Sequence, residues 1–247
     1  STNSATGFNA VSGFENLTGG SGDDTLSGDG GANIIIGGAG NDTINGGDGD
    51  DTYIFAAGWG VDTIGDTAGS DTLDFTDLTS GLVANLGAGI SLIDGLGNSL
   101  NVADNDIEFL LTGSGNDTFS VADGAALSVM VDGGTGSDTL SYAGNAADRS
   151  VQLSGTGSNG FDGAVSGIGG FSNINSFVGG NGTDTLTGLS SGEWHVTSAT
   201  GGQYISGNSL TFDGFDNFVG GSGDDTLTFA AFSTARNINL VGLGAVD

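Results

Sequence analysis

A nine-residue repeat near the N-terminus limits the possible folds of this chain more than any other feature. Residues 19–54 divide into four consecutive units, GGSGDDTLS, GDGGANIII, GGAGNDTIN and GGDGDDTYI, and two looser units begin at Ala57 and Asp66. A unit of nine residues is too short to bury a hydrophobic face by itself, so neighbouring units must stack on one another. The repeat therefore predicts a solenoid.

The sixth position of the unit carries an oxygen-bearing side chain in every copy. Four further copies stand apart from the tandem set, as TGSGNDTFS, GGTGSDTLS, GGNGTDTLT and GGSGDDTLT. If two units form one coil, turns 18 residues apart should stack at the strand spacing of ~4.8 Å, Asp24 over Asp42 and Asn33 over Asp51. We predict that the sixth-position residues are metal ligands: Asp24, Asn33, Asp42, Asp51, Asp62, Asp71, Asp117, Asp138, Asp184 and Asp225.

Short segments of alternating polarity flank the glycine-rich turns, as in FENLTGG, IEFLLTG, INSFVGG and FDNFVGG before the turns and TLDF and TLTF after them. A period of two with glycine punctuation indicates β-strands. The steps between the later Asp residues, from Asp71 onward, are 46, 21, 46 and 41 residues, which we interpret as two, one, two and two longer coils. We expect one continuous all-β solenoid, with lead-in strands at 1–18, a tandem nonapeptide section at 19–75 and longer coils at 76–247.

The charge of the chain excludes several classes of partner and indicates a cation. Thirty acidic residues against two basic ones, both Arg, give a formal net charge of −28. This charge excludes nucleic acid and disfavours anionic membrane surfaces, and no apolar run is long enough to cross a bilayer. Without Cys there are no disulfides or thiolate metal sites, so the available ligands are oxygens, which suit Ca²⁺ or Mg²⁺. Turns rich in carbonyl oxygens favour Ca²⁺, which accepts six to eight ligands in flexible geometry.

The unit G-G-x-G-x-D-x-U-x resembles the RTX, or hemolysin-type calcium-binding, repeat family, most specifically over residues 19–75. The later half is similar to the long β-solenoid repeats of giant secreted bacterial surface proteins. The resemblance implies a right-handed parallel β-roll that is secreted and assembles in extracellular calcium. We therefore expect a calcium-stabilised extracellular structural module, as a filament, matrix, surface-layer or adhesin-stalk subunit that folds after secretion. The alternative is an RTX secretion or folding tail of a larger secreted hydrolase or toxin.

No motif in the sequence predicts an enzyme. A nucleophile elbow, an HExxH pair and a phosphate-binding loop are all missing. The single His195 has no second His to orient it, so we interpret it as a residue of the solenoid surface or of a strand. Ligand or ice binding by a flat face ranks third among the functions, because Thr recurs mainly at the position after Asp.

Two questions stay open at the level of sequence. A separate GGxGxD turn without a stacked partner is also consistent with a simple glycine turn. Asp117 and Asp138 are one coil apart and could share an ion, whereas Asp184 and Asp225 have less evident partners. Neither 1–18 nor 229–246 resembles the polar cap that a solenoid end needs. Either the chain continues within a longer protein, or copies stack head to tail into a filament.

Overall fold

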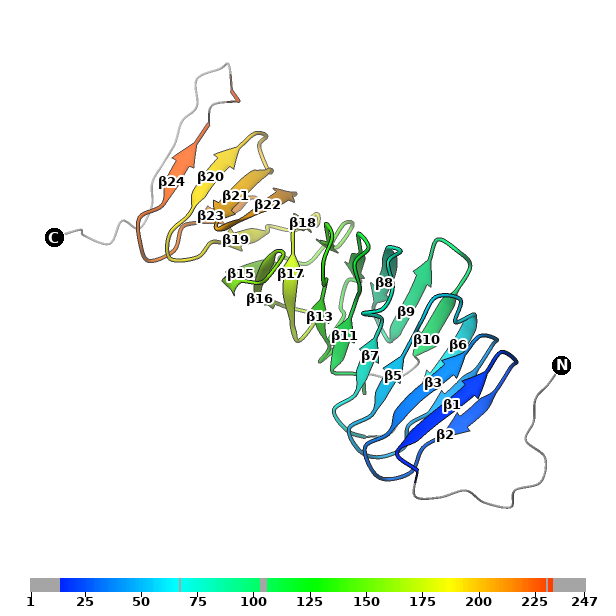
Figure 1. Cartoon of the computed structure of the whole chain (residues 1–247). Coiled ribbons are helices and arrows are strands. Elements are labelled where there is room, and N and C mark those ends of the chain that lie inside the picture. The colour runs from blue at the N-terminus through cyan, green and yellow to red at the C-terminus, as the bar shows by residue number, and fades with distance from the viewer. Residues whose placement is uncertain (1–13, 67, 103–105, 230, 233–247) are drawn as a thin grey trace, which may run out of the picture.

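The computed structural model describes residues 14–66, 68–102, 106–229 and 231–232. Within these residues the chain is all-β, with 24 strands and no helix, and hence no helix that could span a membrane. Two long sheets lie face to face in an elongated solenoid that has β1 (Asn16–Gly20) at one end and β24 (Thr226–Thr228) at the other (Figure 1). The expected fold class, an all-β solenoid of the β-roll type, is confirmed.

The chain passes back and forth between the two sheets. The first sheet has eleven strands, in the order β1, β3 (Ile34–Gly38), β5 (Thr52–Ile54), β7 (Thr72–Asp74), β11 (Phe109–Leu111), β13 (Met130–Asp132), β17 (Gly170–Ile174), β16 (Phe161–Val165), β15 (Ser150–Thr156), β19 (Thr185–Thr187) and β23 (Asn217–Val219). The second has thirteen, in the order β2 (Thr25–Ser27), β4 (Thr43–Asn45), β6 (Val61–Gly65), β10 (Ser99–Val102), β9 (Ile90–Asp94), β8 (Leu82–Leu86), β12 (Thr118–Val121), β14 (Thr139–Ser141), β18 (Ser176–Val178), β22 (Asn208–Asp213), β21 (Gly202–Ser206), β20 (Glu193–Val196) and β24.

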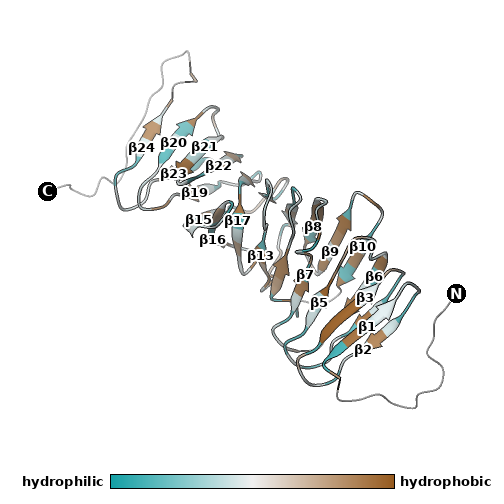
Figure 2. Cartoon of the chain, in the orientation of Figure 1, coloured by the Kyte–Doolittle hydropathy of each residue, from teal (hydrophilic) through white to brown (hydrophobic). Residues whose placement is uncertain are grey.

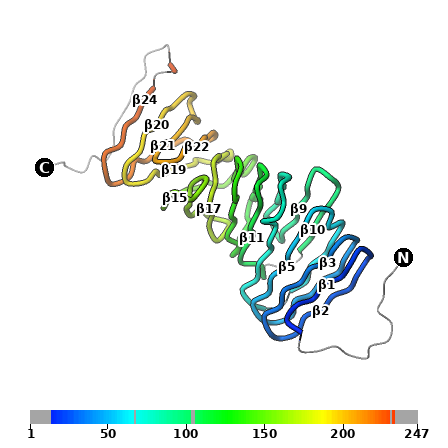
Figure 3. Tube along the Cα trace, in the orientation of Figure 1, coloured from blue at the N-terminus to red at the C-terminus, as the bar shows by residue number. Residues whose placement is uncertain are grey.

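The tandem repeats stack coil on coil, as the trace in Figure 3 shows. β1, β3, β5 and β7 pair in parallel in one sheet, and β2, β4 and β6 do so in the other. Thr25 lies opposite Thr43 and Ile34 lies opposite Thr52, so each strand is 18 residues from its neighbour. The expected stacking of turns one coil apart is confirmed.

Three of the longer intervals contain an antiparallel meander rather than two longer coils. The strands β8–β10, β15–β17 and β20–β22 pair antiparallel within each set. In each meander the chain first advances along the solenoid and then returns, so that β10 pairs with β6, β17 with β13 and β22 with β18. The interpretation of the 46-, 46- and 41-residue steps as two coils each is therefore wrong, because an alternating strand can join a sheet in either direction.

Alternate side chains of the strands fill a narrow core between the sheets. The eighth-position residues Ile35, Ile44 and Tyr53 are at most 1% exposed, whereas Leu26 in the first coil is only partly buried. Figure 2 shows hydrophobic residues concentrated on strands such as β3 and β9. Since the backbone follows the repeat, the core on one side of each turn fixes where the sixth-position side chain lies.

Two parts of the expected organisation are not decided by these strands. Residues 1–13 of the expected lead-in strands lie outside the described residues, as do residues 233–247 at the C-terminal end. The division into 1–18, 19–75 and 76–247 stays a prediction.

Candidate calcium-binding turns

The sixth-position side chains form columns that run along the solenoid. In each stacked pair, the Oδ1 atom of one carboxylate accepts a hydrogen bond from the backbone N–H of the equivalent residue one coil earlier. The donors and acceptors are Asp24 to Asp42 (2.8 Å), Asn33 to Asp51 (2.7 Å), Asp42 to Asp62 (2.8 Å), Asp51 to Asp71 (2.8 Å) and Asp117 to Asp138 (2.9 Å). The sequence-predicted pair Asp117 and Asp138 is thus brought together.

The second oxygen of these carboxylates is buried without a hydrogen-bond partner among the described residues. This holds for the Oδ2 atoms of Asp42, Asp51, Asp62, Asp71, Asp117 and Asp138. Burying an anionic oxygen without a partner is costly, and native proteins rarely do so. The ion pairs of basic side chains among the described residues lie elsewhere, at Arg149 and His195. The turns therefore fit a hard cation that prefers oxygen ligands.

Glycine at the first two positions of the unit makes room for this arrangement. A Cβ on Gly37 would lie 2.5 Å from the Oδ2 atom of Asp42, in the same turn. Gly38 has a φ of 101°, and a Cβ there would overlap the carbonyl of Gly20 in the preceding coil. The two glycines thus serve different ends, since one admits the carboxylate and the other lets the turns stack closely.

The buried carboxylates hold their charge at an electrostatic cost. Burial raises the pKa of Asp62, Asp71 and Asp138 to about 7, and neighbouring carboxylates add to the rise, while the backbone hydrogen bonds of the column oppose it. The pKa values of Asp42, Asp51 and Asp117 are also raised, mainly by burial. A cation between the turns would remove this cost, because it favours the charged form.

Three columns end on a side chain that the sequence analysis did not select. Glu108 accepts the backbone N–H of Asp71 at 2.9 Å, Asn175 accepts that of Asp138 at 2.8 Å, and Asp216 accepts that of Asp184 at 2.9 Å. In return, the N–H groups of these three residues and of the residues after them donate to the Asp carbonyls. The signal was present, since they occupy the second position of IEFL, INSF and FDNF.

The last two predicted ligands lie in turns of a different kind. The Oδ1 atom of Asp184 accepts the N–H of Arg149 at 2.7 Å, and its Oδ2 atom accepts that of Gly180 at 2.5 Å, so both of its oxygens are hydrogen bonded. The residue that pairs with the Asp184 turn from one coil earlier is therefore Arg149 rather than an acid. Asp225 is partly buried and its Oδ1 atom lacks a hydrogen-bond partner within the described chain.

His195 lies on the surface of β20. Its Nε2 atom is 3.3 Å from the carboxylate of Glu193, and both side chains are exposed. The interpretation of His195 as a surface strand residue is confirmed.

Comparison with known protein families identifies the repeat. The RTX calcium-binding nonapeptide repeat matches the chain in four copies, at residues 11–42, 18–53, 169–191 and 210–228. A search of curated proteins gave no match. The RTX repeat is a structural unit and not a catalytic one, and calcium is the ion expected in its turns. The first two copies include the turns of Asp24, Asn33, Asp42 and Asp51, and the last two include those of Asp184 and Asp225, so the chain carries RTX calcium-binding repeats in both its N-terminal and its C-terminal part.

Proposed function

We propose that this chain is a calcium-stabilised extracellular structural module, a subunit of a filament, matrix, surface layer or adhesin stalk that folds after secretion. The observation that carries the proposal is the column of stacked, buried carboxylates that each keep one oxygen without a partner. RTX repeats are typical of secreted bacterial proteins, which supports an extracellular setting. The ligands we propose are those expected from the sequence, with the stacked turns of Asp42, Asp51, Asp62, Asp71, Asp117 and Asp138 as the best supported.

The chain's own groups divide the work in each stacked pair of turns. Oδ1 joins the coils through the backbone, Oδ2 is held ready in a buried position, and the first glycine leaves space beside it. A bound Ca²⁺ would neutralise the buried carboxylates of both turns and so join one coil to the next. At a free concentration ten times the dissociation constant, each filled site adds about 1.4 kcal/mol to the free energy of unfolding.

The same linkage explains why such a chain would fold only outside the cell. At cytosolic calcium, on the order of micromolar or below, sites with a dissociation constant of ~10⁻⁴ M stay empty and add nothing. The net charge of −28 then opposes the compact state. In ~10⁻³ M extracellular calcium the sites fill and the coils close on one another.

The test is a titration of the metal-free chain with calcium, followed by circular dichroism and small-angle X-ray scattering. We expect an elongated particle with a strong strand signal in millimolar Ca²⁺, a large loss of that signal on chelation, and no recovery with Mg²⁺ at the same concentration. A metal-free sample that keeps its full strand signal and melting temperature would contradict the proposal.

Head-to-tail self-association is the second element of the proposal. Among the described strands, β1 and β2 are outermost at one end of the sheets, and β23 and β24 are outermost at the other. Leu227 on β24 is 42% exposed, whereas Leu140 on the central strand β14 is fully buried, so the last described coil leaves apolar surface open. A second copy stacked there would cover that surface and extend both sheets.

Light scattering across a calcium titration tests this element separately. We expect the mass of the particles to grow with calcium and with protein concentration. A monodisperse monomer at high concentration in millimolar Ca²⁺ would rule out assembly through these ends and leave the calcium-dependent fold untouched.

A further inference from the structure

One turn of the tandem set carries an extra carboxylate where the other turns have glycine. The first position of the unit is Gly in the four preceding regular turns, but it is Asp66 in the unit DTAGSDTLD. In the turn stacked below, a Cβ on Gly46 would meet the Oδ2 atom of Asp51 and the hydroxyl of Tyr53. Asp66 nevertheless lies inside the roll and is only 5% exposed.

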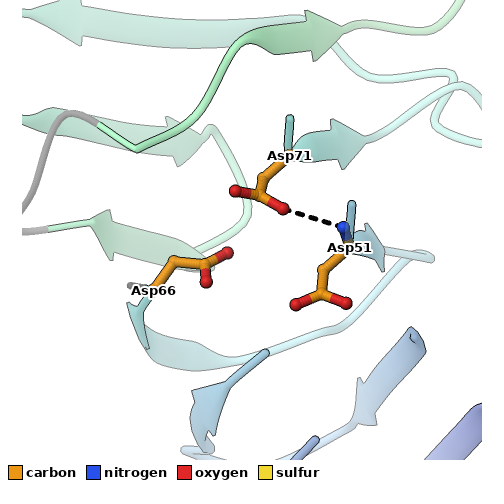
Figure 4. Close-up of side chains that lie close together, drawn as sticks. All are labelled: Asp51, Asp66 and Asp71. Carbon is orange, nitrogen blue, oxygen red and sulfur yellow. Dashed lines mark hydrogen bonds between the residues drawn. The ribbon is translucent and has the colours of Figure 1, made fainter. Parts of the chain in front are cut away.

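Asp66 belongs to a cluster of three buried carboxylates. Asp51, Asp66 and Asp71 each offer one oxygen, and these oxygens all lie within 4.8 Å of one another. Figure 4 shows the three side chains converging, with Asp66 reaching from the loop before β7 toward the two stacked residues. The other two are consecutive members of one column, so Asp66 adds a third carboxylate to a pair of turns of the ordinary kind.

Tyr53 fixes the orientation of Asp66. The Tyr53 hydroxyl accepts the backbone N–H of Gly46 at 2.9 Å and donates its own proton to the Oδ2 atom of Asp66 at 2.7 Å. Because Tyr53 is fully buried in the core, its ring position is set by packing and not by the carboxylate. The acidic group is therefore held in place before any ion arrives, which lowers the cost of ordering it on binding.

The remaining oxygens of the cluster require a positive charge. The Oδ2 atoms of Asp51 and Asp71 are buried, and within the described chain they have no hydrogen-bond partner. Asp66 adds to this demand, since its charge helps to raise the pKa of both neighbours beyond the larger effect of burial. Three carboxylates around one space are a donor set for a divalent cation, because affinity for Ca²⁺ rises with the number of charged ligands and the rigidity of the site.

We propose that Asp66 is a calcium ligand, and that with Asp51 and Asp71 it forms the tightest calcium site of the chain. This inference rests on the proposed calcium-dependent function, and it adds that the turns are not equivalent. The site that fills first is the one at the last coil of the tandem section, directly below the Glu108 hydrogen bond that ends the column.

The experiment is a calorimetric calcium titration of the whole chain and of three variants. Asp66→Asn removes the charge but keeps an acceptor for Tyr53, and Asp66→Gly restores the glycine of the other turns. Asp77→Asn, at an exposed carboxylate outside the columns, makes the same change in net charge and serves as the control. We expect one binding event in the wild-type chain that is at least about tenfold tighter than the others. It should weaken by about tenfold or more in both Asp66 variants and stay unchanged in Asp77→Asn.

Several results would overturn the inference. A tight event that persists in both Asp66 variants would show that Asp66 is not a ligand, and so would an Asp66→Gly chain that binds calcium more tightly than the wild type. Circular dichroism in millimolar Ca²⁺ shows whether each variant is folded, and Asp66→Gly reproduces a turn that this chain already forms elsewhere. If the wild-type chain binds no calcium at all, the proposed function itself fails, which is a different outcome.

Discussion

In the tandem section, residues 19–75, each strand lies 18 or 20 residues from the strand it pairs with in the next coil. In the meander section, the described residues of 76–229, most parallel pairs join residues 32 to 40 positions apart, as between Thr185 and Asn217 or between Met130 and Gly170. Both sections build the same two sheets. The difference shows that one architecture can be reached by short repeated units or by longer units that return on themselves.

The two sections also differ in what stabilises them. Four of the carboxylates with a partnerless Oδ2 atom lie in the tandem section, at Asp42, Asp51, Asp62 and Asp71, against two in the far longer meander section. The meander section instead buries many large rings, among them Phe171 and Phe177, with centroids 5.0 Å apart, and Trp194 and Tyr204, with centroids 4.6 Å apart. Aromatic burial needs no ion, whereas each buried carboxylate does. The tandem section should therefore depend on calcium more strongly.

The largest expected effect is an uneven response to chelation. Removal of calcium should expose the amides of β2 to β7 to rapid hydrogen exchange, while the amides of β12 to β22 keep much of their protection. Hydrogen–deuterium exchange with peptide-level mass spectrometry measures this directly. Equal loss of protection in the two sections would show that the aromatic core of the meander section does not stand without the ions.

The second prediction compares one aspartate from each section. Asp42→Ala leaves the N–H of Asp24 without its acceptor and removes a carboxylate that has stacked neighbours on both sides, Asp24 and Asp62. We expect a loss of about 2–4 kcal/mol in the free energy of unfolding in millimolar Ca²⁺. Asp225→Ala, in a turn whose described neighbours include no stacked acid, should cost less than half as much. Denaturant unfolding of both variants gives the values, and equal losses would tell against the stacked turns as the source of stability.

The third prediction concerns the glycines of the tandem section. Gly38→Ala forces a side chain onto a φ of 101° and against the carbonyl of Gly20, which should cost about 2–3 kcal/mol. Gly30→Ala is the matched control, because a Cβ there meets nothing within 4 Å. Its effect should stay within about 0.5 kcal/mol. A Gly38→Ala chain with an unchanged melting temperature would mean that the turns are not packed as closely as the columns require.

The smallest expected effect is a change in the sign of the pH dependence. Asp62, Asp71 and Asp138 have folded pKa values of about 7, well above the value of 3.8 of an unperturbed Asp. In chelator, their protonation stabilises the fold below that value and is lost as the pH rises through about 7, so the melting temperature should rise by a few degrees from pH 8 to pH 5. In millimolar Ca²⁺ the same acidification should lower it, because protons compete with the ion. Thermal melts at both conditions test the pair of signs.

The sequence was sufficient to predict the columns and the strands that support them. The period of nine set the stacking of Asp24 on Asp42 and of Asn33 on Asp51, because each turn contains its own glycines and its own acid. The same reasoning paired Asp117 with Asp138. In these turns the interactions that decide the structure are local or lie one unit away, so a regular spacing is enough to find them.

The meanders and the extra ligand could not be found in the same way. A strand such as β9 alternates in polarity whether it runs parallel or antiparallel to its neighbour, and only the turn before it decides the direction. Asp66 stands at a position that the repeat pattern reserves for glycine, so it reads as a mismatch until the fold brings it beside Asp51 and Asp71. Departures from a repeat deserved the same scrutiny as the matches.

The spacing of paired strands also decides how the molecule would behave as a load-bearing tether. Under tension applied along the solenoid axis, each coil released from the tandem section frees 18 or 20 residues, which is about 60–70 Å of extended chain. A unit of the meander section holds 32 to 40 residues between paired positions and frees about 110–135 Å. A fibre built from such subunits would therefore lengthen in two step sizes, and the concentration of calcium would set which of them yields first.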